Sequence, residues 1–221
     1  MNFLEIAKRV RQETGVTGDG PTSVASQTGM YKKIVDWVLS AHEEIQLKHN
    51  NWKFDWATFS TPLVQGTEYY SPSVDWSLGV RSWDWDSMYA YPTADGPMNR
   101  TWLTRLDYNA YRQTRLPSVQ GRPIYVTWRP NKELGMYPIP KDGLTFVADY
   151  YKSPEVMSGN TFTPRMPEEY HMAIVWRAVM FFCSSEENPA LYQVASMNYN
   201  NLLGKMETTE LDGPMEAEPL A

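Results

Sequence analysis

Residues 173–182 read AIVWRAVMFF, and they are the centre of an apolar run that extends from Tyr170 to Cys183. When this run is placed on a helical wheel, apolar side chains occupy every side, and only His171 and Arg177 are polar. A helix that is apolar all round is usually buried all round. The run therefore predicts either a central helix packed within one chain or a helix that one chain shares with a neighbouring copy.

Arg177 lies in the middle of the run and needs a partner, because an unpaired buried charge is strongly destabilising. The long helix predicted upstream carries three acids that suit this role, Asp36, Glu43 and Glu44. The run is also shorter than the roughly 20 residues that a helix needs to cross a bilayer. We therefore expect an ion pair within the protein and no membrane partner.

Two helices are predicted ahead of this run, in the first quarter of the chain. Residues 2–13 repeat apolar side chains at three- and four-residue steps, and Asn2 with Glu5 is close to a capping box. Residues 30–52 carry one apolar stripe that ends at Trp52. The second helix has polar residues opposite its stripe, including Asp36 and Glu43.

The last predicted helix begins at Asn188-Pro189, since Asn caps helices well and Pro fits the first helical turn. Its expected buried side is formed by Leu191, Val194, Ala195, Leu202 and Met206. The sequence then becomes acidic and contains two prolines. Residues 207–221 are therefore predicted to form a flexible acidic tail.

Between residues 56 and 152 the helical period disappears. Short stretches rich in Thr, Tyr, Val and Trp alternate with Pro and Gly, which is typical of antiparallel sheets. Pro130-Asn131-Lys132 predicts a hairpin, and a short helix is expected at 107–115. The predicted strands are 56–64, 67–71, 79–91, 99–107, 123–130, 133–140 and 144–152.

The fold class predicted from these patterns is α+β, with a helical bundle formed by the N- and C-terminal helices and an inserted antiparallel β module. The bundle comprises residues 1–55 and 165–206, and the β module comprises residues 56–152. Residues 153–164 are interpreted as a linker between the module and the returning helices.

Charge is distributed unevenly along the chain. The formal net charge is −6, and the acids from Glu186 onward account for all of it. Arginines are concentrated between Arg100 and Arg129, against the single acid Asp107. A basic footprint over the whole protein, as expected of a dedicated nucleic-acid binder, is absent from the composition. The local arginine-rich surface is expected either to be a solvated face or to contact phosphates or acidic groups.

Motifs for catalysis or metal binding are not evident in the sequence. The three histidines are scattered, and the lone Cys183 lies in the apolar run, where a buried thiol is expected. The most enzyme-like stretch is SWDWDS, residues 82–87, because paired carboxylates among tryptophans are typical of sugar-cleaving sites. Strand alternation explains the same stretch without chemistry, with Asp84 and Asp86 on one face. We expect no enzyme activity, no cofactor and no metal ion.

Several stretches together resemble the head-to-tail adaptor, or connector, proteins of tailed bacteriophages. They include IVDWVLSAHEEIQLKHNNWKF (34–54), QGRPIYVTWRPNKELGMYPIP (120–140) and MPEEYHMAIVWRAVMFFCSSEENPALYQVASMNYNNLL (166–203). The resemblance covers most of residues 1–206, and it lies in the order and spacing of the elements. It implies a structural virion protein that forms an oligomeric ring, expected to be a dodecamer, beneath the portal protein.

The resemblance also implies partners and places. The expected partners are further copies of the chain, the phage portal protein, a downstream tail or nozzle protein, and double-stranded DNA that passes through the ring without sequence readout. The expected location is the virion neck at the head–tail junction, after viral assembly in the host cytoplasm. The alternatives kept open are a carbohydrate-binding or carbohydrate-cleaving tail protein and a DNA-binding module.

Candidate site residues follow from the resemblance. Subunit or portal contacts are expected at Trp176, Arg177, Met180, Phe182, Met215 and Leu220. A DNA channel or a phosphate-contacting surface is expected at Arg105, Arg112, Arg115, Arg122 and Arg129. Because each subunit of a closed ring has two neighbours, an all-round apolar helix can also be explained by packing between copies.

Overall fold

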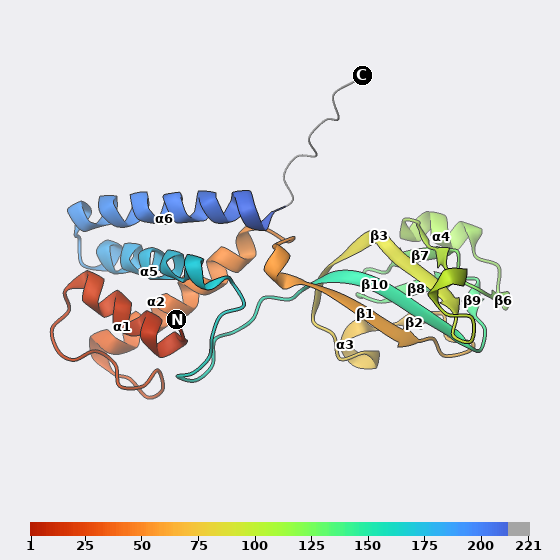
Figure 1. The fold of residues 1–221 in the computed structure, drawn as a ribbon, viewed down its shortest axis with the longest axis horizontal. Coiled ribbons are helices and arrows are strands. Elements are labelled where there is room, and N and C mark those ends of the chain that lie inside the picture. The colour runs from red at the N-terminus through yellow and green to blue at the C-terminus, as the bar shows by residue number, and fades with distance from the viewer. Residues whose placement is uncertain (212–221) are drawn as a thin grey trace, which may run out of the picture. The chain divides into compact units, whose positions relative to one another are not determined.

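A computed structural model describes residues 1–211 of the chain, which form two compact units (Figure 1). The helical unit contains Met1–Asp55 and the described residues from Pro154 onward, and the β unit contains Trp56–Ser153. The helical unit is built from helices and the β unit mainly from antiparallel strands, so the predicted α+β class is confirmed. Each unit has its own hydrophobic core.

The helical unit packs three helices around a fourth. The bounds of its elements are α1 Phe3–Thr14, α2 Gly29–Lys48, α5 His171–Ser185 and α6 Pro189–Glu210, with short 3-10 turns at Lys53–Asp55 and Glu168–Tyr170. The capping box predicted for α1 is confirmed, since Asn2 accepts a hydrogen bond from the Glu5 backbone and Glu5 returns one to Asn2. Asn188 caps α6 by accepting from the Leu191 backbone N–H at 3.1 Å.

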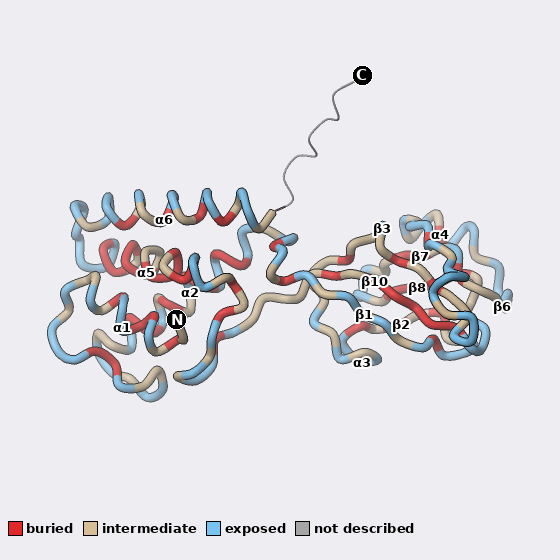
Figure 2. The backbone as a smooth tube through the Cα atoms, in the orientation of Figure 1, coloured by how far each residue is buried: buried red, intermediate tan, exposed pale blue. Residues whose placement is uncertain are grey.

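α5 is the central helix, and it lies between α1, α2 and α6 (Figure 2). No residue from Tyr170 to Cys183 is exposed in this unit, and Ala173, Ile174 and Val175 are completely buried. The all-round apolar pattern is thus accounted for by packing within one chain. Copy-to-copy packing is not required to bury this helix.

α2 is shorter than predicted. It ends at Lys48, so the prediction that it continues to residue 52 is wrong. Trp52 is nevertheless almost completely buried, because the chain turns back after the helix. Its indole N–H donates to the Ile45 carbonyl at 3.2 Å, and its ring stacks on Phe54. The apolar pattern was read as one continued stripe, whereas Trp52 covers the end of the helix from outside it.

The segment that leads back from the β unit is part of the helical unit and is not a free linker. Met157 and Met166 are buried in the core of this unit. The N–H of Phe3 donates to the Phe162 carbonyl at 2.8 Å, and that of Leu4 donates to the Asn160 carbonyl. The segment therefore packs along the start of α1 although it has no regular secondary structure.

α6 is longer than predicted, because residues 207–210 belong to it and not to the tail. Glu207 accepts hydrogen bonds from Lys48 and from His49, both at 2.9 Å, which ties the last turns of α6 to the end of α2. The hydroxyls of Tyr170 and Thr209 are 2.8 Å apart. The contacts of Glu207 and Thr209 thus hold this part of the acidic sequence against the rest of the helical unit.

The buried side of α6 also differs from the prediction. Ala195, Tyr199, Leu203 and Met206 are buried, whereas Val194 is 47% exposed. The stripe of buried residues therefore includes an aromatic residue, Tyr199, that a purely aliphatic pattern does not reveal.

The β unit contains two four-stranded sheets and a small third pairing. The first sheet has the order β1-β10-β3-β4, with β1 Trp56–Pro62, β10 Leu144–Lys152, β3 Val80–Pro92 and β4 Thr101–Trp102. The second has the order β2-β8-β7-β5, with β2 Tyr69–Tyr70, β8 Leu134–Tyr137, β7 Tyr125–Trp128 and β5 Thr104–Arg105. Strands β6 Gln120–Gly121 and β9 Ile139–Pro140 form the third pairing, and the short helices are α3 Pro72–Asp75, α4 Tyr108–Thr114 and the 3-10 turn Pro97–Asn99.

The long pairings of the β unit are antiparallel, and only the two-residue pairings of β5 with β7 and of β6 with β9 are parallel. The predicted hairpin at residues 130–132 joins β7 to β8 and is confirmed. The core of this unit contains residues of both four-stranded sheets: Phe146 and Met88 of the first and Leu134 of the second are completely buried, and Trp76 stacks on Phe146.

The SWDWDS stretch lies in β3, but it does not alternate regularly. The pairing of β3 with β10 shifts register between Val147 and Asp149, so that Asp84 pairs with Asp149 and Tyr89 pairs with Val147. The backbone N–H of Asp86 donates to Asp84 at 3.2 Å, as in a local bend. The expected arrangement of both carboxylates on one regular strand face is therefore wrong, because a bulge interrupts the strand there.

Candidate interaction surfaces

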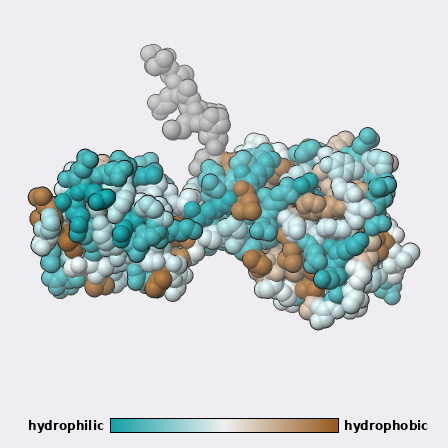
Figure 3. Space-filling view, turned by 180° about the vertical axis from the view of Figure 1, so that it is seen from behind, coloured by the Kyte–Doolittle hydropathy of each residue, from teal (hydrophilic) through white to brown (hydrophobic). Residues whose placement is uncertain are grey.

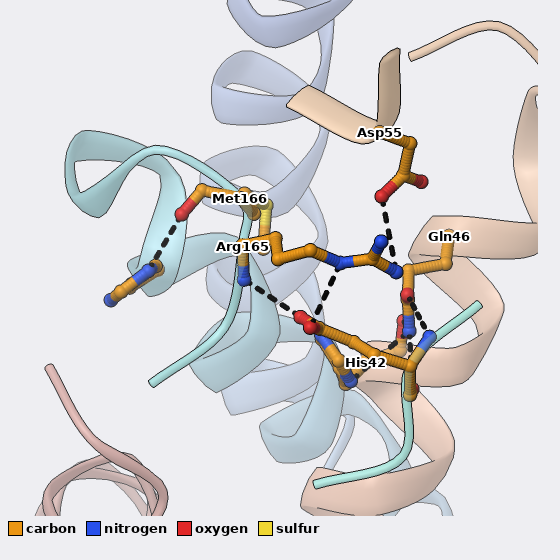
Figure 4. Close-up of polar contacts among 7 residues, drawn as sticks. His42, Gln46, Asp55, Arg165 and Met166 are labelled. Carbon is orange, nitrogen blue, oxygen red and sulfur yellow. Dashed lines mark hydrogen bonds and ion pairs between the residues drawn. The ribbon is translucent and has the colours of Figure 1, made fainter. Parts of the chain in front are cut away.

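The clearest polar structure of the helical unit is a cluster around Arg165 (Figure 4). The guanidinium of Arg165 forms ion pairs with Asp55 at 3.2 Å and with Glu155 at 2.9 Å. Asp55 is the last residue before the chain enters the β unit, and Glu155 is the second residue after it returns. One arginine therefore holds both ends of the chain segments that lead to the inserted unit.

α2 contributes two further members of this Arg165 cluster, His42 and Gln46. The Gln46 side chain donates to the Glu155 carbonyl at 3.0 Å and accepts from the Glu155 backbone N–H at 2.8 Å. His42 is almost completely buried, and its ring lies 3.5 Å from the Glu155 carboxylate. Residue 155 is thereby fixed to α2 through its backbone and its side chain together.

The electrostatics of the Arg165 cluster favour an ionised Glu155. Burial alone would raise the pKa of this carboxyl group. Hydrogen bonds from His42 and from the Arg165 backbone N–H, together with the nearby Arg165 charge, outweigh burial and hold the pKa of Glu155 below its ordinary value. The cluster was not predicted from the sequence, since Gln46 and Glu155 are 109 residues apart and only the four-residue spacing of His42 and Gln46 hinted at a shared face.

Arg177 finds the acidic partner that its position in α5 requires. Its guanidinium makes two hydrogen bonds to the Glu44 carboxylate, at 2.9 and 2.8 Å. It also lies over the ring of Phe181 at 4.6 Å and near the ring of Tyr199 at 5.8 Å. Of the three acids predicted as candidates, Glu44 is therefore the partner.

The Arg177–Glu44 pair borders a surface hollow of about 480 Å³ between α2, α5 and α6. Leu47 stands at its rim and is 55% exposed. The hollow is lined by Glu44, Leu47, Lys48, Arg177, Met180, Tyr199, Asn200 and Leu203. Two of the predicted interface residues of α5, Arg177 and Met180, line this hollow.

The other predicted interface residues lie in different environments. Met180 and Phe182 are 6% and 8% exposed, so they contribute little surface to a partner. Trp176 is half-buried and lies on the same helix. Met215 and Leu220 lie outside the described residues. Among the described candidates, contact with a neighbouring copy is thus a proposal for Trp176 and Arg177.

On the face of the molecule seen in Figure 3, the hydrophobic side chains of the described residues do not form one continuous surface. From behind, the hydrophobic residues appear as several separate patches (Figure 3). On α6 the exposed large hydrophobic residues are Tyr192, Val194 and Met197, at 39%, 47% and 66%. In the β unit Trp56 and Trp102 are about half exposed, and Met98 is fully exposed. Isolated apolar residues are ordinary on protein surfaces, so each needs a second observation before it indicates a partner.

The structure divides the five candidate arginines of the β unit into two groups. Arg105 and Arg112 are exposed, and Arg105 lies over the ring of Trp85 at 4.3 Å. Arg122 is held inside the unit by hydrogen bonds to Asn99 and Thr101. Arg105 and Arg112 are therefore the two members with the greatest freedom to meet an outside anion.

Arg115 and Arg129 belong to internal contacts of the second sheet. Arg115 forms an ion pair with the buried Glu68, which also accepts a hydrogen bond from the Tyr111 hydroxyl at 3.1 Å. Arg129 forms an ion pair with Glu133 and lies over the Tyr69 ring at 4.3 Å. Burial, and then the hydrogen bond and negative charge of Glu68, raise the pKa of Tyr69 to about 12.

Metal-binding clusters and membrane-spanning helices are both absent from residues 1–211. No group of three or more His, Cys, Asp or Glu side chains in this range is arranged to hold a metal ion. None of the helices within the same range is long and apolar enough to cross a membrane. Burial raises the pKa of the Cys183 thiol, which disfavours the reactive thiolate.

Comparison with known proteins gives one result that spans nearly the whole chain. The family model described as SU10 adaptor protein matches residues 1–218. No curated protein matches the chain. The match includes the helical unit, the inserted β unit and most of the acidic C-terminal residues.

Proposed function

The chain belongs to the SU10 adaptor protein family, a family of phage head-to-tail adaptors, and from this we propose that it forms a ring beneath the portal through which DNA passes. The observation that carries the proposal is the family match over residues 1–218. The family supports a phage adaptor role for the chain. The number of subunits, for which we propose twelve, and the position under the portal go beyond that match.

The proposal gives the chain four kinds of neighbour: further copies of itself, the portal protein above, a tail or nozzle protein below, and passing double-stranded DNA. It locates the protein at the virion neck after assembly in the host cytoplasm. It assigns no catalytic step and no cofactor to any residue.

Two surfaces support specific parts of this proposal. The half-buried Arg177 lines the hollow of the helical unit, which could receive an apolar side chain of a neighbouring copy between α2 and α6, and the half-buried Trp176 lies on the same helix. The exposed Arg105 and Arg112 carry charge that suits the phosphates of passing DNA. Contacts of this kind are independent of base sequence, as passage of a whole genome requires.

The test is a measurement of particle mass by mass photometry. The purified chain is measured alone and after mixing with the portal protein of the same phage, and the particles are imaged by negative stain. A discrete multimer that appears as a ring, in either sample, is the expected result. If both samples contain only monomer at micromolar concentration, the ring proposal is wrong.

DNA passage makes a separate demand, since tight binding would stall the moving duplex. We expect duplex DNA to bind weakly, and binding to weaken further as the salt concentration rises. The slope of the logarithm of the binding constant against the logarithm of the salt concentration should be shallower in the Arg105→Gln/Arg112→Gln variant. Arg122→Gln serves as a comparison, because Arg122 is engaged inside the unit. An unchanged salt slope in the double variant would remove these two residues from the channel proposal.

A further inference from the structure

One edge of the first sheet in the β unit is long, regular and unprotected. β1 is the terminal strand of the order β1-β10-β3-β4 and has seven residues (Figure 1). All of them pair with β10, from Trp56 opposite Tyr151 to Pro62 opposite Thr145, without a register shift. The opposite side of β1 has no strand beside it in the described sheets, so half of its backbone N–H and C=O groups point away from any strand partner.

The side chains of β1 add no barrier to a further strand. The sequence from Trp56 to Val64, WATFSTPLV, contains no charged residue. Natural sheets usually guard an edge of this length with charges, bulges or a covering element. Here only Pro62, at the far end, is a residue that limits pairing. Trp56 and Val64 are 47% and 61% exposed at the two ends of the edge.

The other edge of the same sheet is β4, which has only two residues, Thr101 and Trp102. β4 pairs with β3, with Trp102 opposite Tyr89, and the Trp102 side chain is 53% exposed. Arg100 lies over the Trp102 ring at 5.1 Å. Arg122 donates to the Asn99 carbonyl and to Thr101, which shortens the free part of this edge to the neighbourhood of Trp102. One sheet therefore presents two unlike edges.

Strand direction decides which edges can meet in a ring. All three pairings of the sheet are antiparallel, so β1 and β4 run in opposite directions. Neighbouring copies in a cyclic ring are related by a rotation about one axis, and the contact joins two different surfaces. β1 of one copy beside β4 of the next is then antiparallel. Antiparallel pairing of β1 with β1 requires a twofold axis between the two copies, and neighbours in a cyclic ring of more than two subunits are not related by one.

We propose that β1 of one copy pairs with the β4 edge of the next copy, so that the first sheet continues across the subunit boundary. This inference rests on the proposed ring. Main-chain hydrogen bonds join the two edges as in other cases of strand addition. Trp102 lies on the same sheet face as Thr58 and Ser60, as the register through Tyr89 and Val147 shows, so its ring packs over the neighbour's β1.

Cysteine pairs test this contact directly. Thr101 shares the opposite, inner sheet face with Ala57 and Thr61, since its row runs through Ala90 and Phe146. Thr101→Cys is combined with Ala57→Cys in one variant and with Thr61→Cys in another, and the assembled protein is oxidised. Directly opposed residues in antiparallel strands are close enough for a disulfide. The expected result is a ladder of covalent multimers in at least one double variant, with no cross-linked product from any single variant.

Other outcomes overturn the inference in distinguishable ways. Dimers from Ala57→Cys or Thr61→Cys alone indicate that β1 pairs with itself. Rings that form normally while neither double variant cross-links show that the sheet does not continue between copies. If mass photometry finds no ring under any condition, the proposed function itself has failed and this contact falls with it.

A second pair of variants separates edge pairing from folding. Thr58→Lys/Ser60→Lys places two charges on the exposed side chains of the β1 edge, and it should raise the concentration needed for half-assembly at least tenfold. The matched control is Ala94→Lys, in an exposed turn after β3, which should assemble as the unmodified chain does. Circular dichroism should be unchanged in both. Equal assembly of the two variants contradicts the proposed contact.

Discussion

At the scale of single residues, ion pairs in the helical unit link segments that are far apart in the sequence. Glu44 and Arg177 join α2 to α5, and Arg165 joins the two segments that lead to the β unit. The need for an acid opposite Arg177 was predictable, because an unpaired charge in an apolar helix is unfavourable. The choice of Glu44 was not, since Asp36 and Glu43 lie on the same predicted helix and only the packing angle of two helices selects among them.

Glu44→Ala should lower the free energy of unfolding by about 1–2 kcal/mol. The substitution removes the carboxylate that accepts two hydrogen bonds from the half-buried Arg177 guanidinium. Glu43→Ala is the matched control, since Glu43 is its exposed neighbour in α2. It should change stability by less than about 0.5 kcal/mol. The measurement is urea unfolding of the full chain. Equal effects of the two substitutions would show that the Arg177 pair contributes nothing to stability.

Glu155 should make stability depend on pH in acid. Its pKa in the folded protein is lowered, so it contributes stability that is complete above the unfolded-state pKa of about 4.3. As the pH falls below that value towards the lower folded pKa, the unfolded state binds more protons and this stability is lost. Glu155→Gln should therefore lose less melting temperature between about pH 5 and pH 3 than the unmodified chain does. These two pH values, each about one unit from it, lie on either side of the unfolded-state pKa of a glutamate.

The control for this pH effect is Glu169→Gln, because Glu169 is exposed and lies just before α5. Its melting temperature should follow that of the unmodified chain at each pH. A Glu155→Gln profile parallel to the unmodified one would mean that the Arg165 cluster does not favour the ionised carboxylate.

At the scale of elements, the pattern of apolar residues was sufficient for the central helix and insufficient for its neighbours. α5 could be predicted because every side of it is apolar, which leaves no orientation to choose. α6 could not be oriented correctly, because its buried stripe runs through Tyr199 and leaves Val194 outside. The end of α2 was misplaced because the buried Trp52 continues its apolar stripe beyond the helix. The end of α6 was misplaced because Glu207 pairs with Lys48 and His49, and such contacts between helix ends leave no periodic signal.

Truncation separates the last helical turn from the residues beyond it. A chain that ends at Met206 lacks Glu207 and its contacts with Lys48 and His49, whereas a chain that ends at Leu211 retains them. The shorter chain should be less stable than the longer one by about 1–3 kcal/mol, the magnitude of hydrogen bonds to charged groups. Thermal unfolding of the two chains is the measurement. Equal melting temperatures would return residues 207–210 to the acidic tail.

Two substitutions in α5 distinguish packing within the chain from contact between copies. Ile174→Ala removes a completely buried side chain and should cost about 2–5 kcal/mol of folding stability. Trp176→Ala affects a half-buried residue of the same helix, and under the ring proposal it should weaken assembly more than it weakens folding. Chemical unfolding and mass photometry of both variants provide the comparison. A Trp176→Ala variant that assembles normally would remove this residue from the subunit contact.

At the scale of the whole molecule, the chain builds a helical unit and interrupts it with a β unit. The change of period at residue 56 made the insertion visible in the sequence, because helices and strands impose different spacings on apolar residues. The bulge in β3 and the two short parallel pairings were not visible, since they depend on which strands become neighbours. The same applies to the candidate arginines, of which Arg115 and Arg129 turned out to serve the interior of the second sheet.

The β unit should fold when it is expressed alone as residues 56–153. It has its own hydrophobic core, and its first and last strands pair with each other, Trp56 opposite Tyr151. We expect a single cooperative thermal transition by circular dichroism and a dispersed amide NMR spectrum. The control is the same fragment carrying Phe146→Ala, which empties a completely buried core position and should abolish the transition or shift it to much lower temperature.

The insertion has a mechanical consequence. A domain appended at one end of a chain is attached by one chain connection. The β unit leaves the helical unit after Asp55 and returns at Pro154, so two chain connections attach it. Arg165 forms ion pairs with a residue next to each connection, Asp55 and Glu155. A force that pulls on the β unit is therefore shared by two chain connections, and the residues next to both of them pair with the Arg165 guanidinium. A single cut in either connection, by a protease or by chemical cleavage, leaves the unit covalently attached by the other.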